Sequence, residues 1–362
     1  MKRTYNELTS QLLQRCEREH GGENVVFSPL SIITLLLMLA EATGGSTRDE
    51  IMGCLRSGGR KKLTKGDMLP MLREISESAS LNSANAVCVK HELAPTINED
   101  YAAALQKDFE GELFASKDII ADVNRWVNEK TRGMIPEIAD ESMRNMLASL
   151  MNAVAFEAGW QEPYFDENIR EGLFRGLDKS TTKVPMLHSQ EDSYIENRLF
   201  TGFAKAYEGG EFSFMALLPK KEGEKALREA AEKADFTELF AKRRYAQVNV
   251  TMPEFTYSFN EDLTGFCKDL GIREAFSNHA DFSPMSTEWL KVDQILHKAR
   301  IEVDRKGTKA AAVTFAGMVA GCAFPPEKPK TVRLDRPFLF AIMHEETGVP
   351  VFVGVVKQVY MM

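Results

Sequence analysis

The spacing of hydrophobic positions changes partway along this chain. In the first 148 residues or so, the pattern mainly favours helices, of which the first is amphipathic and the next is apolar. Helices are predicted within residues 1–55, with a break at Gly21-Gly22 and new starts at Ser28-Pro29 and Ser46–Glu50, and again over Ile97–Phe109 and Val123–Lys130. A buried strand is predicted over Ala84–Val89, and residues 56–66 form a basic loop in this interpretation.

After about residue 148 the apolar residues alternate or cluster between turn signals, which favours strands. The predicted strands are Leu147–Phe156, Thr182–Leu187, Gly202–Tyr207, Phe212–Pro219, Val248–Pro253, Ala299–Val303, Phe338–Glu345 and Val349–Val356. Two further helices are predicted over Glu224–Lys233 and Asn260–Leu270. Because helices come first and strands later, without regular alternation of the two, the pattern predicts an α+β fold.

Charge and hydropathy exclude several classes of partner. The 362 residues carry 45 basic and 53 acidic side chains, and this formal net charge of −8 argues against nucleic acid as a partner. The longest apolar run, Leu30–Ala40, is shorter than the ~20 residues that span a bilayer, so no membrane partner is expected. Polar residues follow Met1-Lys2-Arg3 instead of a signal-peptide core. We therefore expect either a cytoplasmic protein or a secreted one whose leader has been removed.

The residues that usually carry enzyme or metal chemistry form no recognisable pattern. The five cysteines are scattered without a CxxC spacing, which indicates free thiols instead of a disulfide framework or a zinc site. The six histidines lack metal-ligand spacing, and the sequence contains no GxSxG, HExxH, GxGxxG or P-loop motif. We therefore expect no enzymatic activity, no cofactor and no metal.

One long connection, residues 305–334, has an unusual composition. Connections longer than ~15 residues without their own structure are uncommon and usually functional. From 308 to 318 its even positions are uncharged and, until Met318, small (Thr308, Ala310, Ala312, Thr314, Ala316), whereas the odd positions beside them include Lys309 and Phe315. Because successive side chains of a strand point to opposite faces, this alternation fits a segment that can lie in the middle of a sheet. Pro325-Pro326 would end such a strand.

Two other interpretations of this segment stay open on sequence grounds. An alanine-rich helix is disfavoured by Val313-Thr314-Phe315 and by the glycines at 317 and 321. A flexible linker would not be expected to alternate so regularly.

Several separated motifs resemble the serpins, a family of serine protease inhibitors, in the family's order and over nearly the whole chain. They are Asn24–Ser31, Val123–Val127 with Thr131-Arg132-Gly133, Asn152–Phe156 with Gly159-Trp160, Phe214–Pro219, Asp281-Phe282-Ser283, His297-Lys298-Ala299, Ala310-Ala311-Ala312 and Arg336–Phe340. In its modest length the chain is similar to prokaryotic members.

The resemblance implies a fold and a mechanism. The fold would be a single serpin domain over 1–362, with N-terminal helices, large mixed or antiparallel sheets and an exposed reactive-centre loop at about 305–334. A serine protease would attack this loop as a substrate. While the acyl-enzyme persists, the cut loop would enter a sheet as a new central strand and trap the protease.

The hinge of the loop enters first, so the family's inhibitory members keep it small. The matching hinge residues are Gly307, Thr308, Ala310, Ala311 and Ala312. At the top of the sheet, called the breach, this chain departs from the family. Arg305 and Glu254 stand where the family usually has an acidic and a basic residue. We predict that they form a reversed ion pair near Trp160.

The gap through which the loop passes is held in the family by a polar cluster, the shutter. The matching residues are Ser28, Ser31, Asn152 and His297. Because buried polar groups need partners, we predict that these four hydrogen-bond to one another, in a mechanical and not a catalytic role.

The attacked residue sets the target. The family's usual spacing, counted from Arg305, places the reactive bond at Gly321–Cys322, with Ala320 and Ala323 as the alternative positions. All are small and neutral, which suits an elastase-like or subtilisin-like protease and not a trypsin-like one.

The expected partner is therefore a serine protease, bound by a monomer. The basic residues in 56–65 match a region where some family members bind glycosaminoglycans, but a solvated loop is the favoured interpretation. The competing function is a non-inhibitory serpin that acts as a carrier or chaperone. Bulky or charged inward hinge residues would favour it, and this hinge has none.

Overall fold

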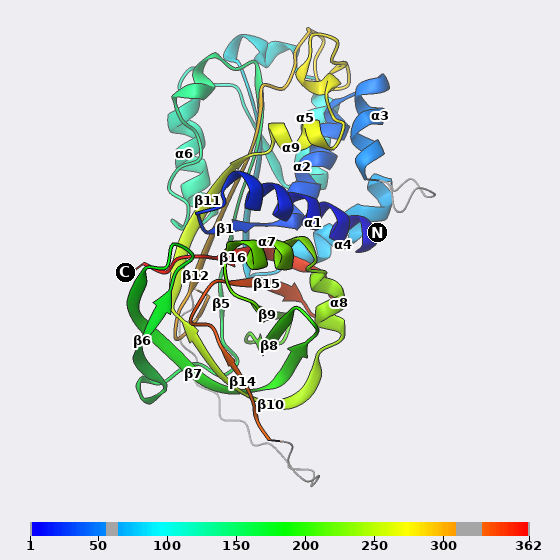
Figure 1. Cartoon of the computed structure of the whole chain (residues 1–362). Coiled ribbons are helices and arrows are strands. Elements are labelled where there is room, and N and C mark those ends of the chain that lie inside the picture. Colours follow the sequence, from blue (N-terminus) through cyan, green and yellow to red (C-terminus); the bar gives the residue numbers. More distant parts are fainter. Residues whose placement is uncertain (1, 56–63, 309–327, 361–362) are drawn as a thin grey trace. The chain divides into compact units, whose positions relative to one another are not determined.

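The computed structural model describes residues 2–55, 64–308 and 328–360 (Figure 1). The chain forms two compact units. Unit 1 comprises Met1–Leu8, Phe27–Ala155 and Ser258–Arg300, and unit 2 comprises Thr9–Val26, Phe156–Tyr257 and Ile301–Met362. The elements shared by the two are α1 (Lys2–Glu19), β1 (Val25–Phe27), β4 (Ala148–Phe156), β11 (Phe255–Asp262) and β12 (Gln294–Val303).

Unit 1 holds most of the helices. Its own elements are α2 (Pro29–Ala42), α3 (Gly45–Cys54), α4 (Lys65–Ser76), β2 (Leu81–Val89), η1 (His91–Thr96), α5 (Glu99–Phe109), β3 (Gly111–Phe114), α6 (Ile119–Lys130), η2 (Glu141–Asn145), α9 (Thr264–Asp269) and η4 (Glu274–Phe276). Helix α2 begins as predicted, with Ser28 as its N-cap and Pro29 in its first turn. Its residues are apolar nearly all round, and most of them are buried.

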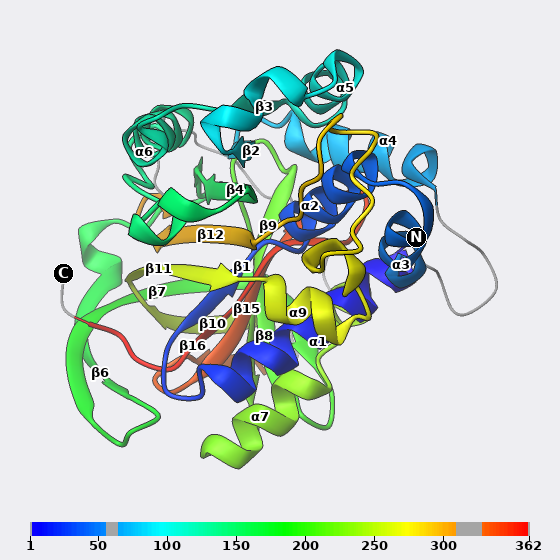
Figure 2. The ribbon, with the colours of Figure 1, turned by 90° about the horizontal axis from the view of Figure 1, so that it is seen from above.

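The strands of unit 1 lie in the order β3-β2-β4-β12. Strands β4 and β12 run parallel, and His297 lies opposite Asn152 in their register. Helix α6 covers this sheet, since Val123, Trp126 and Val127 pack in one core cluster with residues of β2 and β4 (Figure 2). All nine residues of β4 are buried, which explains its nearly continuous apolar sequence.

Unit 2 is mainly β-structure. Its own elements are β5 (Ala158–Gly159), η3 (Asp166–Asn168), β6 (Ile169–Arg175), β7 (Thr181–Glu196), β8 (Phe200–Ala206), β9 (Phe212–Pro219), α7 (Glu224–Glu232), α8 (Phe236–Ala241), β10 (Arg244–Pro253), β13 (Gly307–Thr308), β14 (Lys330–Arg333), β15 (Phe338–His344) and β16 (Pro350–Val356). A sheet runs in the order β1-β16-β15-β9-β8-β7-β10-β14, with β6 on β7. The whole of β9, β15 and β16 is buried. The end of β12 enters unit 2, where β13 pairs with it and with β5.

Most predicted elements are present, but several bounds differ and some short elements were not predicted, among them β3, β6 and α8. Residues 260–262 belong to strand β11 instead of a helix, because alternate burial continues through Phe259 and Glu261; α9 begins only at Thr264. The basic loop ends earlier than predicted, because the Thr64–Asp67 capping box starts α4 at Lys65. The connection 305–334 contains the strands β13 and β14, the second of which runs parallel to β10.

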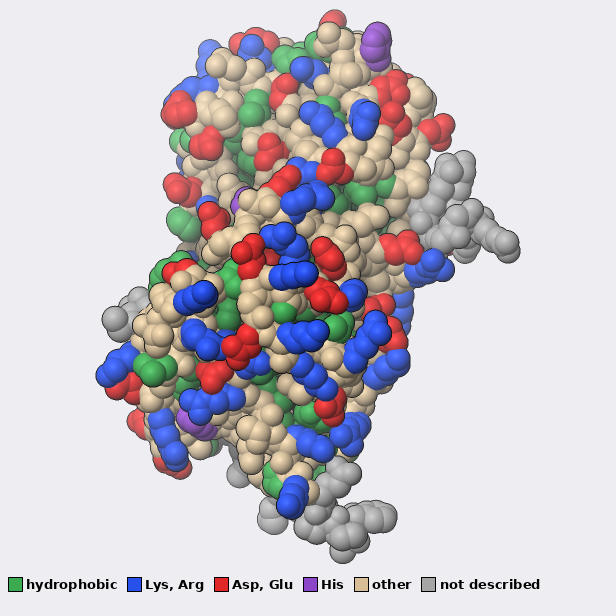
Figure 3. Space-filling view, viewed as in Figure 1, with side chains coloured by type: hydrophobic (Ala, Val, Ile, Leu, Met, Phe, Trp, Pro, Cys, Tyr) green, Lys and Arg blue, Asp and Glu red, His purple; other side chains and the backbone are tan. Residues whose placement is uncertain are grey.

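The surface carries many charges of both signs, and Figure 3 shows acidic and basic side chains interspersed over one face. Several form exposed ion pairs, such as Lys220–Glu196 and Lys183–Glu171. Within residues 2–55, 64–308 and 328–360, no helix combines the length and the apolar character needed to cross a membrane.

Candidate functional site

The four predicted shutter residues lie together in unit 1 and form one hydrogen-bonded chain. The backbone N–H of Ser31 donates to the Ser28 hydroxyl oxygen at 3.3 Å. The backbone N–H of Ser28 donates to Nε2 of His297 at 3.0 Å. On its other side, His297 Nδ1 lies 3.0 Å from Oδ1 of Asn152. The N-cap of α2 and the strands β4 and β12 are thereby joined through buried side chains.

These contacts fix the protonation state of His297. Because Nε2 accepts the Ser28 N–H, the ring proton lies on Nδ1 and is donated to Asn152. The imidazole is fully buried, and this burial lowers its pKa to about 3. His297 is therefore neutral at any pH near 7, and both of its ring nitrogens are engaged in buried hydrogen bonds, which suits a mechanical role.

The sequence analysis missed two members of this cluster. The Asn152 amide donates to Asn85 Oδ1 at 2.8 Å and to the Ser83 hydroxyl at 3.4 Å, both on β2. The Asn85 amide in turn donates to the backbone oxygen of Phe109. The signal in the sequence was an asparagine inside an otherwise apolar buried strand, a polar group that needs a partner.

The first two hinge residues, Gly307 and Thr308, form β13 in unit 2. Thr308 is fully buried; it lies opposite Val303 of β12 and Ala158 of β5 in the registers, and its hydroxyl lies 2.7 Å from the Tyr207 hydroxyl. Glycine is required at 307, because a Cβ there would lie 2.2 Å from the carbonyl oxygen of Ala158. The hinge thus begins as a strand with a neighbour on each side.

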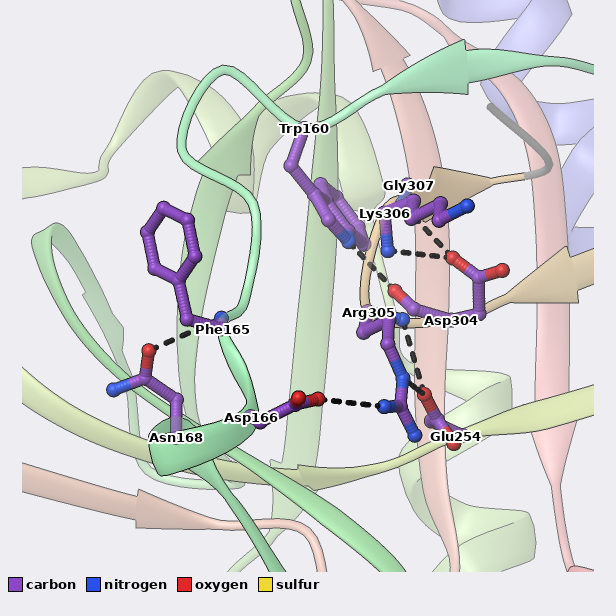
Figure 4. Close-up of polar contacts among 9 residues, drawn as sticks. All are labelled: Trp160, Phe165, Asp166, Asn168, Glu254, Asp304, Arg305, Lys306 and Gly307. Carbon is purple, nitrogen blue, oxygen red and sulfur yellow. Dashed lines mark hydrogen bonds and ion pairs between the residues drawn. The ribbon is translucent and has the colours of Figure 1, made fainter. Parts of the chain in front are cut away.

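The reversed ion pair predicted at the breach is present (Figure 4). Arg305 Nε lies 3.2 Å from Glu254 Oε1, and the backbone N–H of Arg305 donates to the same oxygen at 3.1 Å. Arg305 Nη1 lies 3.2 Å from Oδ1 of Asp166, a partner that was not predicted from the sequence. Because the Arg305 side chain is 40% exposed, we expect these ion pairs to contribute only about 0–1 kcal/mol.

Trp160 lies at the same place, as predicted. Its indole N–H donates to the backbone oxygen of Asp304 at 2.8 Å, and its backbone N–H donates to that of Lys306 at 2.9 Å (Figure 4). Its ring stacks on Tyr207 with a centroid separation of 4.5 Å and an interplanar angle of 10°. The segment 304–308 is therefore held by aromatic side chains as well as by the ion pair.

The remaining site residues of the prediction lie outside the described residues. They are Ala310, Ala311 and Ala312 of the hinge, the reactive bond Gly321–Cys322 and its alternatives Ala320 and Ala323. Their roles stay predictions.

Comparison with known proteins decides the family. A family model described as "Serpin (serine protease inhibitor)" matches residues 3–359. This chain belongs to the serpin family. The α+β fold with its N-terminal helices and large mixed sheets is accordingly the serpin fold.

Relatives of this serpin occur in animals and plants. Neuroserpin of Mus musculus is 30% identical over 359 residues, which cover 92% of this chain and 85% of the relative. Serpin-Z3 of Arabidopsis thaliana is 30% identical over 364 residues, covering 92% and 91%. Among solved structures, native tengpin, a thermophilic serpin, superposes with a TM-score of 0.85 at 28% identity, covering 98% of this chain and 94% of that one. Serpins are typically protease inhibitors that bind serine proteases and are not themselves enzymes.

Proposed function

We propose that this serpin is inhibitory and traps a serine protease covalently. The protease serine attacks the carbonyl carbon of Gly321, an ester bond to the loop forms, and the amine of Cys322 leaves with a proton. Before water hydrolyses the ester, the segment that begins at Thr308 enters the sheet as a strand. The small neutral residues at 320–323 favour an elastase-like or subtilisin-like target.

The observation that supports this proposal most directly is the state of the hinge. Thr308 is already paired as a strand on both sides, and it is fully buried without carrying a charge. The next residues of the same face, Ala310 and Ala312, are small enough to follow it between the strands. A carrier or chaperone would not need a hinge of this composition. The prokaryotic type and the monomeric state remain predictions.

Ala310→Arg tests the mechanism. Thr308 is already buried in the uncut structure, whereas Ala310 is the next residue expected on the inserting face. Arginine at 310 would become a buried, unpaired charge on insertion, so the loop should be cut but not inserted. Lys309→Glu, on the opposite face of the predicted strand, is the matched control and should keep the complex.

The complex is detected by SDS electrophoresis. Wild-type protein incubated with an elastase should give a complex that survives the detergent. The A310R variant should be cleaved as a substrate with at least a tenfold loss of complex. A wild type that forms no such complex, or an A310R variant that forms it fully, would contradict the proposal.

The reactive bond has its own test. Mass spectrometry of the peptide released by elastase should place the cut between residues 319 and 324. Cleavage elsewhere would refute the assignment of Gly321–Cys322 while leaving the trapping mechanism intact.

A further inference from the structure

A buried charge pair, separate from the partly exposed pair at the breach, lies next to the hinge and has no place in the mechanism so far. Lys205 on β8 is only 3% exposed, and its ammonium group lies 2.9 Å from Oε1 of Glu191 on β7. The Ser189 hydroxyl donates to the same carboxylate oxygen at 2.6 Å. A buried lysine is rare unless it is paired, because the charge loses its hydration. We therefore looked for a function of the Lys205–Glu191 pair in its other contacts.

The other neighbours of the ammonium group are aromatic. Lys205 Nζ lies 4.8 Å from the ring centroid of Tyr164 and 5.7 Å from that of Trp160. The Tyr164 hydroxyl lies 3.2 Å from the Ser189 hydroxyl, so this ring is also joined to the carboxylate through a serine. Cation–π attraction and hydrogen bonding therefore hold both rings against one ion pair.

Both aromatic residues also hold the segment that leads into the hinge. The backbone N–H of Tyr164 donates to the Arg305 oxygen at 2.8 Å, and Trp160 donates to the oxygens of Asp304 and Lys306. Figure 4 shows the Trp160 side chain directed toward this segment. Trp160 further stacks on Tyr207, whose hydroxyl contacts Thr308. An unbroken series of contacts therefore runs from Glu191 to the hinge.

We propose that Lys205 and Glu191 are positioning residues that hold Trp160 and Tyr164 against residues 304–308 and thereby slow insertion of the uncut loop. This inference rests on the proposed function, because it assumes that the loop can insert. Without the pair, the two rings can rearrange and release the segment more easily. The expected effect is a shorter lifetime of the active form.

The lifetime is measured by cleavage of the loop. Protein is held at about 15 °C below its unfolding midpoint, and aliquots receive a short pulse of thermolysin, which cuts an accessible 309–327 segment but not an inserted one. The fraction that can still be cut gives a half-life. Lys205→Met/Glu191→Met removes both charges together and so avoids leaving one buried alone. Its half-life should fall about tenfold, while Lys205→Arg, which keeps the charge and the cation–π contacts, should retain most of the wild-type value.

A second buried lysine–glutamate pair in the same unit provides the control for stability. Lys357 and Glu17 lie 2.8 Å apart, with side-chain exposures of 0% and 4%, and the described contacts join neither to Trp160 or Tyr164. Lys357→Met/Glu17→Met removes a buried ion pair and should therefore change the thermal unfolding midpoint. It should not shorten the half-life of the cleavable form tenfold.

Two results would overturn the proposal. One is a Lys205→Met/Glu191→Met variant whose loop stays cleavable as long as that of the wild type. The other is an equal shortening in Lys357→Met/Glu17→Met. Failure of the proposed function is recognised separately, by the absence of an SDS-stable complex in wild-type protein, since the thermolysin measurement requires no target protease.

Discussion

The shutter cluster and the breach pair hold strands by different physical means. The shutter residues Ser28, Asn152 and His297 are fully buried and uncharged, and each hydrogen bond has a defined direction. At the breach, Arg305 and Glu254 are charged, and Arg305 is in partial contact with water. In the resemblance described above, the shutter keeps the residue types expected of the family, whereas the breach carries the expected charges in reverse.

This difference has a physical reason. When one member of a directional chain of buried donors and acceptors is replaced by another residue type, its neighbours lose their hydrogen-bond partners and the fold is destabilised. An ion pair depends on opposite charges at a suitable distance and tolerates their exchange. The shutter is therefore constrained by residue type at every position. At the breach the side-chain pair requires only opposite charges, and the added constraint is the Glu254 oxygen that accepts the Arg305 backbone N–H. The predictions that follow test this contrast.

The largest effect is expected for Asn152→Ala. The change leaves the His297 Nδ1–H without its acceptor and Asn85 without its donor, both buried. We expect a loss of about 2–4 kcal/mol in the free energy of unfolding, measured with urea. Asn249→Ala, which removes an exposed amide bonded to Gln190, is the matched control and should change stability by less than about 0.5 kcal/mol. Equal effects of the two variants would show that the buried hydrogen bonds of Asn152 do not make the shutter sensitive to substitution.

An intermediate effect is expected from pH. Folded His297 has a pKa of about 3, whereas in the unfolded chain it is near the ordinary ~6.5, so the unfolded state binds the extra proton first. Its contribution to stability is complete above pH ~6.5 and is lost as the pH falls toward 3. Between pH 6 and pH 4 we expect a loss of about 2 kcal/mol from this group. Urea titrations of His297→Gln should show a correspondingly flatter pH dependence. An unchanged slope would contradict the buried neutral state.

The smallest effect is expected at the breach. Arg305→Ala removes the partly exposed ion pairs with Glu254 and Asp166, so it should lower stability by about 0.5 kcal/mol, and by less at high salt. Glu254→Ala should cost about 1 kcal/mol more, because the backbone N–H of Arg305 also loses its acceptor. Urea unfolding of both variants at low and high salt measures this difference. The reverse order would mean that the guanidinium group, and not the backbone contact, anchors the segment.

The fold was largely predictable because most elements have a simple pattern. The strand predicted over Phe212–Pro219 coincides with β9, since turn signals bound a continuous apolar run. The helix predicted over Asn260–Leu270 was wrong at its start because Glu261, a charged residue on the buried face of β11, broke the alternation of apolar and polar residues. Strand β14 was missed because four residues beside Pro329 give little periodic signal and depend on β10 for pairing.

Only those site residues that belong to a motif of the family were predictable from the sequence. Shutter and breach residues could be found because the family's motifs specify them. Lys205 and Glu191 could not be predicted. They are 14 positions apart in the sequence, and no local pattern shows that the lysine on β8 faces the carboxylate on the neighbouring strand β7. Such contacts depend on the registers of β7 and β8.

The central claim is that the uncut molecule is held by kinetics in a state that is not its most stable one. The most direct test compares the thermal unfolding midpoints of intact protein and of protein cut once within residues 319–324. Insertion would add a dozen or so backbone hydrogen bonds at ~1 kcal/mol net each, so the midpoint should rise by about 20 °C or more after the cut. Equal midpoints before and after the cut would show that no such energy is stored.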